Sequence, residues 1–435
     1  MTVTTPPRGP EIEQDRDLEQ RIAELEALIE EARRRARRRR QRNGAAALLV
    51  AAAGSAAFIG FGGHGGGGAG TAATARAPGS QAPVSNADSP PLGALPPDSG
   101  RPESIAFDPR SPRIVYVGTY GHVIKTTDSG AHWQATATSG SGWVGANEAL
   151  TADPRHPGTL YAGTQTGVYK TVDGGSSWRP SHRGLFVPHL GERQKGWVIA
   201  LAVDPANTKI VYAGSDRVSK STDGGRSWKT VFPPHRSQNP RENVSALAIA
   251  PTRPVGIYAI KSDFSNGRTA IYKSTDAGTS WQATTGVRGT YAMGFATALA
   301  VDPRDPTTVY AGIGGNVLKT TNAGGSWQPI ADGLPIAAAG RGSCHCQRGV
   351  TALAVDPRRA GTVYAALSEG GIYKTTNGGQ TWIHAAIGTS LLQMYAVAVD
   401  PARPATVYAA GLSETGDGAR ILRSTNSGHT WATAP

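Results

Sequence analysis

The sequence predicts an all-β fold, a seven-bladed β-propeller, and three observations lead to this prediction. A nine-residue stretch, represented by "KSTDGGRSW" at 220–228, occurs seven times and always ends in tryptophan. Successive copies lie 45 to 55 residues apart, which is the spacing of propeller blades. Every unit also contains three short β-rich runs bounded by turn residues. The repeated tryptophans are Trp133, Trp178, Trp228, Trp281, Trp327, Trp382 and Trp431.

Each unit predicts four strands in a fixed order. An apolar run ends in Asp-Pro, as in "LAVDP" at 201–205, although Ala250 replaces the Asp in the fourth unit. A second run such as "VYAG" at 211–214 and a third such as "GVYK" at 167–170 lead to the nine-residue stretch, whose tryptophan opens the fourth strand. Four short strands joined by tight turns form the meander of a propeller blade. The second run supplies one tyrosine per unit: Tyr116, Tyr161, Tyr212, Tyr258, Tyr310, Tyr364 and Tyr408.

The nine-residue stretch predicts a tight turn between the third and fourth strands. Its Asp or Asn accepts hydrogen bonds from backbone N–H groups further along the chain, the glycines allow positive φ, and the tryptophan buries a large ring beside the turn. The spacing Ser/Thr-x-Asp-x-Gly-x-x-Trp resembles the Asp-box, or bacterial neuraminidase repeat, and recurs across residues 103–435. The resemblance implies a structural turn at the blade periphery. We therefore expect Asp128, Asp173, Asp223 and Asp276 to be structural rather than catalytic.

The chain divides into four predicted segments: a charged helix over 1–43, an apolar segment over 44–63, a linker over 64–102 and the propeller over 103–435. In the helix, apolar residues follow alternating steps of four and three, which is a heptad seam typical of parallel dimers. Only about three heptads are present. We therefore expect either a homodimer through residues 12–36 or a single solvated helix. The seam residues are Leu18, Ile22, Leu25, Ile29, Ala32 and Ala36.

Eight arginines lie within residues 33–42, directly before the uncharged stretch 44–63. Basic residues beside an apolar stretch are typical of a membrane segment whose amino-terminal side stays in the cytoplasm. We expect a single-pass anchor in the cell membrane, a cytoplasmic N-terminus, an extracytoplasmic propeller and no nucleic acid partner. The stretch is short and rich in alanine, so an export signal cleaved near Ala75 and Ala77 is the alternative.

The linker and the charge balance bear on the partner. Residues 64–102 contain mainly Gly, Ala, Pro and Ser, a composition typical of a flexible tether. The first 43 residues carry a net charge of +2, so +10 of the formal +12 belongs to the remainder. A basic exported domain favours an anionic environment, unless its charge serves solubility alone. The predicted partners are therefore an anionic polysaccharide or an envelope protein, in addition to the membrane contacted by 44–63.

Cys344 and Cys346 flank His345 and are the two cysteines of the chain. This spacing is weaker than a paired CxxC signature as a sign of a metal site. A structural or incidental role is the first interpretation, and a local disulfide or soft metal site is the alternative. We predict no metal and no cofactor.

Variation between the units is concentrated in the segments that join blades and in those that join second and third strands, which share one face of a propeller. Function on a regular scaffold usually lies in such loops. Aromatic rings interleaved with arginines suit sugars bearing carboxylates, and they suit a protein interface equally well. The candidate ligand-binding residues are Trp143, Trp197, Arg241, Tyr291, Arg341 and Tyr395.

A register argument predicts which side chains surround the mouth of the central channel. Glu103 and Glu148 come from neighbouring blades at this register. Packed sheets lie about 10 Å apart, close to the roughly 6.5 to 9.5 Å that separates the two carboxylates of inverting glycosidases. Glu103 and Glu148 are therefore a speculative catalytic pair. Counting five residues back from each Asp-Pro position gives Glu103, Glu148, Ile199, Ser245, Thr297, Thr351 and Tyr395.

The chain resembles three groups of Asp-box proteins to different degrees. The Arg-Ile-Pro signature of sialidases is absent, and the nearest string is "PRIVY" at 112–116. Xyloglucanase-like glycosidases use two propeller domains, whereas this sequence predicts one. The seven-bladed photosystem II assembly and stability factors, which act by binding, are similar in blade number and box regularity. These resemblances leave three hypotheses: a membrane-anchored binding or assembly module, a glycoside hydrolase, and a mainly structural surface protein.

Overall fold

The computed structural model describes residues 92–96, 99–136, 147–185, 197–233, 242–252, 255–263, 268–285, 287, 297–313, 315–335, 349–385, 392–413 and 418–433. The chain forms two compact units, Met1–Ser80 and Gln81–Pro435. The first unit, with the predicted helix, the dimer seam 12–36 and the anchor 44–63, lies outside the described residues. Within the described part of the chain, no helix is long and apolar enough to cross a membrane.

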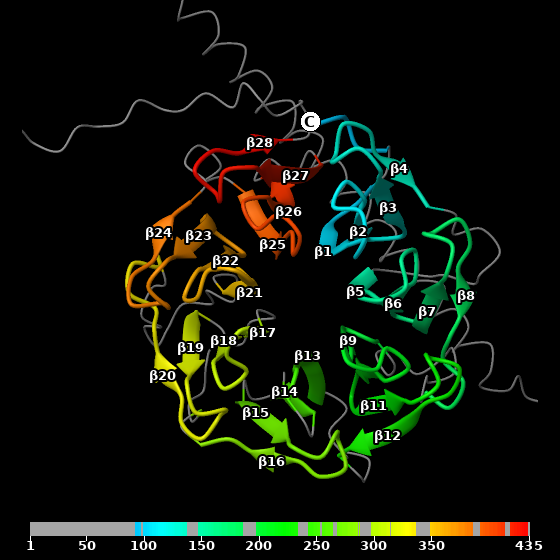
Figure 1. Ribbon diagram of the computed structural model, residues 1–435, viewed down its shortest axis with the longest axis vertical. Coiled ribbons are helices and arrows are strands. Elements are labelled where there is room, and N and C mark those ends of the chain that lie inside the picture. The colour runs from blue at the N-terminus through cyan, green and yellow to red at the C-terminus, as the bar shows by residue number, and fades with distance from the viewer. Residues whose placement is uncertain are drawn as a thin grey trace, which may run out of the picture. The chain divides into compact units, whose positions relative to one another are not determined.

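Seven antiparallel sheets of four consecutive strands surround a common axis, which confirms the predicted seven-bladed β-propeller (Figure 1). The first strand of each sheet lies innermost and the fourth outermost (Figure 1). Blades 1 and 2 contain β1 (Pro102–Phe107), β2 (Val115–Thr119), β3 (Val123–Thr126), β4 (Gln134–Ala135), β5 (Asn147–Ala152), β6 (Leu160–Thr164), β7 (Gly167–Thr171) and β8 (Arg179–Pro180). Blades 3 and 4 contain β9 (Ala200–Val203), β10 (Val211–Gly214), β11 (Val218–Ser221), β12 (Lys229–Phe232), β13 (Glu242–Ala250), β14 (Gly256–Asp263), β15 (Arg268–Ser274) and β16 (Gln282–Ala283).

The remaining three blades repeat this pattern. Blades 5 to 7 contain β17 (Thr297–Val301), β18 (Val309–Ile313), β19 (Asn316–Thr320), β20 (Gln328–Pro329), β21 (Val350–Val355), β22 (Val363–Leu367), β23 (Gly371–Thr375), β24 (Ile383–His384), β25 (Leu392–Val399), β26 (Val407–Ser413), β27 (Ala419–Ser424) and β28 (Ala432–Thr433). Each second strand consists almost wholly of buried residues, because it lies between the first and third strands and its faces pack against adjacent blades.

The antiparallel strand order gives the ring two different faces. The Asp-Pro turn between the first and second strands and the nine-residue turn between the third and fourth lie on one face, which we call the turn face. These turns contact each other: Gly174 N donates to Gly158 O at 2.9 Å, and Gly378 N donates to Gly361 O at 2.8 Å. The opposite face carries the hairpins between second and third strands and the segments that join blades. We call it the link face.

The nine-residue turns are held by one repeated set of hydrogen bonds. In blade 3, Ser221 Oγ donates to Asp223 Oδ1 and accepts from Gly225 N, both at 2.8 Å. Ser227 N also donates to Asp223 Oδ1 at 2.9 Å. Asn322 in blade 5 accepts the equivalent bonds through Oδ1 at 2.8 and 2.9 Å. Asp and Asn therefore accept the same hydrogen bonds in the turn, and these bonds engage the side chain within the turn itself.

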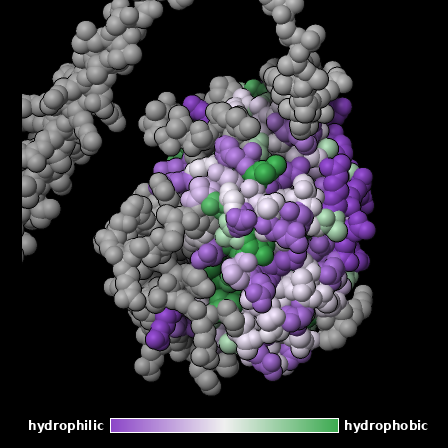
Figure 2. Space-filling model, turned by 90° about the vertical axis from the view of Figure 1, so that its left-hand side faces the viewer, coloured by the Kyte–Doolittle hydropathy of each residue, from purple (hydrophilic) through white to green (hydrophobic). Residues whose placement is uncertain are grey.

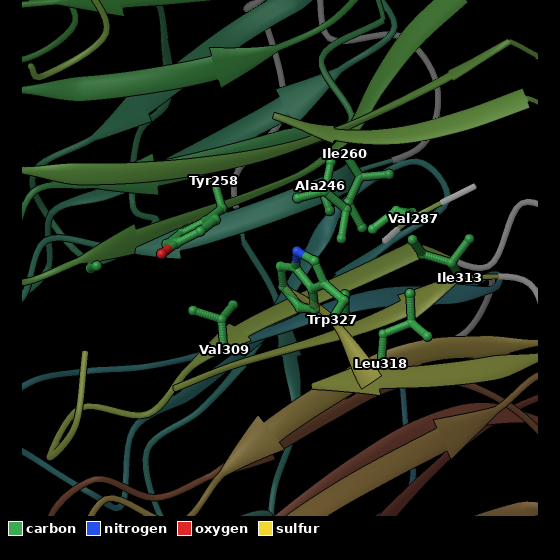
Figure 3. Packing of buried hydrophobic residues seen from close by; sticks show 11 residues of the cluster. Ala246, Tyr258, Ile260, Val287, Val309, Ile313, Leu318 and Trp327 are labelled. Carbon is green, nitrogen blue, oxygen red and sulfur yellow. The ribbon is translucent and has the colours of Figure 1, made fainter. Parts of the chain in front are cut away.

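Neighbouring blades are joined in both directions. Lys220 Nζ and Tyr212 OH of blade 3 donate to Ala277 O of blade 4 at 2.8 and 2.9 Å. In the other direction, Trp228 Nε1 donates to Ser181 O, just after the last strand of blade 2, at 2.7 Å. In Figure 3 the Trp327 ring lies among apolar side chains of blades 4 and 5, namely Ala246, Ile260, Val309 and Leu318. The repeated tyrosine and tryptophan thus form the inter-blade core.

The ring closes by the same contacts, without strand exchange. All four strands of blade 1 come from residues 102–135, and all four of blade 7 come from 392–433. Tyr408 OH of blade 7 donates to Ser129 O of blade 1 at 3.0 Å, and Arg423 Nη1 donates to the same oxygen. This oxygen corresponds to Ala277 O in blade 4. The seventh seam therefore uses the same acceptor as the interior seams, with Arg423 in place of lysine.

Part of the segment predicted as linker packs against the propeller. Leu92 is 6% exposed and contacts a cluster that spans the seam between blades 7 and 1. Gly93 N donates to Gly130 O at 2.8 Å, which adds backbone pairing. The packed part of the chain therefore begins before the first strand. The cluster around Leu92 includes Val115, Ile124, Trp133, Ala396 and Ile421.

Candidate functional site

The innermost strands carry a repeated irregularity near the link face. Five of the seven contain a register shift between residues that flank a single extra residue. A β-bulge leaves that residue outside the ladder, bends the strand and redirects the side chain. The bulged residues are Glu103, Glu148, Ser245, Thr351 and Tyr395, all at the register position derived from the sequence.

Side chains from three adjacent blades meet at this position. Arg101 Nε donates to Glu103 Oε1 within blade 1. The Arg101 guanidinium carbon also lies 4.8 Å from the ring centroid of Tyr395 in blade 7. Glu148 of blade 2 interacts electrostatically with both Arg101 and Glu103. We call Arg101, Glu103, Glu148 and Tyr395 the inner-strand cluster.

The cluster shifts the protonation of its carboxyl groups. Burial and, to a lesser extent, the nearby Glu148 carboxylate raise the pKa of Glu103 to about 7, against the opposing effect of Arg101. The Glu103 side chain is only 8% exposed, so poor solvation of its charged form is the main cause. Burial likewise raises the pKa of Glu148, against the influence of Arg101. At neutral pH Glu103 can therefore hold or release a proton.

The chemistry available to this cluster is recognition and proton exchange. Arg101 presents a cation against an aromatic face, and Tyr395 OH donates to Gln393 Oε1 at 2.9 Å. Thr351, another bulged residue, is instead used in the fold, because its hydroxyl donates to Ala366 O and Met394 O at 3.0 and 2.9 Å. The bulged position therefore concentrates side chains with functional chemistry in blades 7, 1 and 2.

The structure describes some of the predicted site residues and leaves others outside the described ranges. The structure brings Glu103, Glu148 and Tyr395 together, and it places Trp197, which is 38% exposed, just before the first strand of blade 3. No group of His, Cys, Asp and Glu in the described ranges has the arrangement of a metal site. Trp143, Arg241, Tyr291 and Arg341 lie outside the described residues, as do Cys344 and Cys346.

Sequence reasoning missed Arg101 and Gln393. Both lie two residues before a bulged residue, Arg101 before Glu103 and Gln393 before Tyr395. Both therefore lie at one and the same offset from the aligned position. Extending the register alignment by two residues would have found both.

Two curated proteins match part of the chain. The "Probable oligoxyloglucan-reducing end-specific xyloglucanase" of Neosartorya fischeri is 24% identical over 201 residues, covering 43% of this chain and 23% of that protein. The xyloglucanase of Hypocrea jecorina is 28% identical over 213 residues, covering 42% and 24% respectively. The chain therefore spans about a quarter of the length of the curated relatives it matches. No protein-family model matches it.

Solved structures share the propeller fold at low sequence identity. YCF48 bound to D1 peptide aligns with a TM-score of 0.52 at 15% identity, covering 77% of this chain and 99% of that chain. The extracellular domain of the one-component system BT4673 from B. thetaiotaomicron aligns with a TM-score of 0.51 at 15% identity, covering 77% and 39%. Identities this low show the fold alone. The protein is a seven-bladed β-propeller whose inner strands carry a cluster of charged and aromatic side chains.

Proposed function

We propose that this propeller is a binding module of the cell envelope, which recognises a glycan or protein partner on its link face through the inner-strand cluster. Residues 44–63 anchor it in the cell membrane, with the N-terminus in the cytoplasm and the propeller outside. Residues 12–36 pair two copies in this arrangement. The partner is an anionic polysaccharide or an envelope protein.

The observation that carries the proposal is the bulge at one register position of five blades. Bulges are maintained features that redirect side chains, and they occur often beside functional sites. Every other repeated polar position described above is used by the fold: the Asp or Asn holds the turn, and the lysine and tyrosine hold the next blade. At the bulged position, by contrast, the residue changes in charge, size and aromatic character from blade to blade.

The side chains in and around the inner-strand cluster support recognition of a polar partner. An arginine stacked on a tyrosine and bonded to a carboxylate offers a cation, an anion and an aromatic face within one cluster. Two large aromatic residues, Trp197 and Tyr120, are 38% and 54% exposed at the link-face ends of their blades. Exposed aromatic rings supply contact area to sugars and to peptides. The propeller structure with a bound D1 peptide supports peptide recognition on this fold.

Binding by the full chain tests the proposal. The panel contains xyloglucan oligosaccharides, β-glucans, sialosides and acidic wall polysaccharides, with membrane proteins crosslinked in cells as the second arm. We expect Arg101→Gln and Tyr395→Phe to weaken capture of any ligand found, while Glu369→Gln, in the β22–β23 hairpin, leaves it unchanged. Binding that survives both cluster variants would refute the inner-strand site.

A glycoside hydrolase is the second candidate, and the pKa of Glu103 favours it. A carboxyl group with a pKa of about 7 beside a second carboxylate can serve as a general acid. The partial matches to two xyloglucanases point to β-glucans as the first substrates to try. The contact from Arg101 weakens this candidate, because it favours the ionised form of Glu103. Turnover abolished by both Glu103→Gln and Glu148→Gln would establish it, whereas binding without turnover would exclude it for the substrates tried.

A further inference from the structure

We infer that the turn face carries a second binding site: an arc of arginines over blades 5, 6, 7 and 1 that binds a linear polymer with repeated carboxylate or phosphate groups. This site lies on the face opposite the inner-strand cluster and does not depend on the function proposed for it. All members of the arc are exposed and lie in Asp-Pro turns. The arginine arc consists of Arg304, Arg358, Arg359, Arg403, Arg110 and Arg113.

Hydrogen bonds from blade to blade make the arc continuous. Arg304 Nη1 donates to Arg358 O at 2.6 Å, across the seam between blades 5 and 6. Arg358 Nη2 donates to Ala402 O at 2.9 Å, and Arg403 Nη2 donates to Pro112 O at 3.0 Å, across the next two seams. A guanidinium has five N–H donors, so these contacts position the group and leave donors for a ligand. Successive cations are thereby held in the Asp-Pro turns of successive blades, with Arg403 one position further along its turn than Arg304 and Arg358.

Three of the four nine-residue turns next to the arc lack the charge that the other turns carry. Blades 1 to 4 use Asp128, Asp173, Asp223 and Asp276, whereas blades 5 to 7 use Asn322, Asn377 and Asn426. Burial disfavours ionised Asp173, but hydrogen bonds from Ser177 and Thr171 bring its pKa to about 2, so it is charged at neutral pH. Asn377 keeps the geometry, because its Oδ1 accepts from Thr375 Oγ1 at 2.8 Å and from Thr381 N at 3.1 Å.

The turn face is therefore divided electrostatically. In the described turns of blades 5 to 7, the exposed acidic residue is Asp305, which accepts from Thr307 and Thr308. The other acids of these turns, Asp302, Asp356 and Asp400, are buried, and each accepts a backbone N–H of its own turn. Asp400 Oδ2 also accepts from Arg403 Nε at 3.2 Å, so this member of the arc is paired with an acid of its own turn. Viewed from the side of β20 and β24, hydrophilic residues gather along one edge of the ring (Figure 2). Three charges are thus missing in blades 5 to 7, which carry four of the six arginines, whereas blade 1 keeps Asp128.

The arrangement favours a polymer over an isolated anion. A guanidinium matches the two oxygens of a carboxylate or phosphate, which suits repeated groups of either kind. Each seam supplies at least one positioned arginine, so a chain that follows the arc meets a cation at each blade. Exposed pairs are individually weak, so several simultaneous contacts are needed for stable binding.

Binding of the full chain to polygalacturonate and to polyphosphate tests the inference and separates the two sources of negative charge. We expect the variant with Arg304→Gln, Arg358→Gln and Arg403→Gln to lose about tenfold in affinity for the preferred polymer. The matched control removes three exposed cations from the turn face of blades 2 and 3: Arg155→Gln, Lys209→Gln and Arg226→Gln. We expect it to change the affinity less than about twofold. Equal losses in the two variants would overturn the inference.

A second variant keeps every arginine and its inter-blade hydrogen bonds. Asn322→Asp, Asn377→Asp and Asn426→Asp install the residue that blades 1 to 4 already use, so the turns should remain folded. We expect affinity to fall about threefold or more at low salt, and the difference to shrink as salt is added. Unchanged affinity at low salt would refute the electrostatic division. The proposal would be overturned if the protein bound neither polymer, or if it bound only phosphatidylglycerol vesicles. If the Tyr395→Phe variant still binds the polymer, the arginine arc is a site separate from the inner-strand cluster.

Discussion

In the inner-strand cluster, the Glu148 carboxylate raises the pKa of Glu103. Replacing Glu148 by Gln removes a negative charge near Glu103, while the burial of Glu103 remains. We expect the pKa of Glu103 to fall below about 7 and to stay above its ordinary value. Carboxyl-carbon NMR over a pH titration measures this directly. An unchanged pKa would mean that burial alone sets the shift, and Glu369→Gln is the control.

Glu103 also makes stability depend on pH. Its pKa is about 7 in the folded state, compared with 4.5 for the unperturbed group of an unfolded chain. The folded state therefore binds the proton more tightly than the unfolded state does. The contribution of this group is therefore fully present below about pH 4.5 and is lost as pH rises through 7. We expect Glu103→Gln to flatten the decline in unfolding free energy between these pH values. A parallel pH profile in the variant would contradict this sign.

Substitutions of the repeated Asp test whether its hydrogen bonds stabilise the nine-residue turn. We expect Asp223→Ala to lower the unfolding free energy by about 1 to 2 kcal/mol, because the bonds from Ser221, Ser227 and the Ser227 backbone are lost. Asp223→Asn should cost less than about 0.5 kcal/mol, since Asn serves in three other blades. Urea unfolding at pH 7 measures both variants. Equal destabilisation by Ala and Asn would show that the charge, rather than the hydrogen bonds, stabilises the turn.

The structural roles of residues that recur in every blade were predictable from the sequence. The turn roles of Asp223 and its equivalents, and the burial of Tyr212 and Trp228, follow from spacing alone. The contact of Arg101 with Tyr395 was not predictable, because it joins residues 294 positions apart across the closing seam. A register alignment within blades cannot specify which side chains meet between the first and last blades.

At the scale of elements, the chain before β1 contributes to the first blade. We expect a chain that begins at Gln81 to unfold as cooperatively as the full protein. A chain that begins at Arg101 should fold but lose about 2 kcal/mol, because it lacks the buried Leu92 side chain. Thermal and urea unfolding of both chains measure the difference. Leu92→Ala in the full chain is the matched control, and its stability should resemble that of the shorter chain.

Strand positions were predictable from the alternation of apolar runs and turn residues, but the bulges were not. Glu103 and Glu148 occur within apolar strands, and nothing in their immediate sequences demands an extra residue in the ladder. Bulges depend on how the inner strands pack around a closed ring. The sequence could therefore align this position without indicating that its side chains leave the regular pleat.

For the whole molecule, closure depends on Arg423 and Tyr408. Because six blades use lysine where blade 7 uses Arg423, we expect Arg423→Lys to change the unfolding free energy by less than about 0.5 kcal/mol. Arg423→Met should cost about 1 to 3 kcal/mol, since the bond to Ser129 O is lost in a buried seam. Denaturant unfolding compares them, with Lys220→Met at an interior seam as the reference. A much larger loss at position 423 would identify closure as the weakest seam.

The hydrogen bonds shared by the seven seams bear on how the ring can be opened. Tyr408 reaches blade 1 as Tyr212 reaches blade 4, so the seam between blades 7 and 1 uses the same cross-blade hydrogen bond, with Leu92 packed there in addition. The seven blades form a closed cycle of similar units. A circular permutant that joins the present ends and opens another gap should retain the ring, which is the behaviour expected of a fold built by tandem duplication.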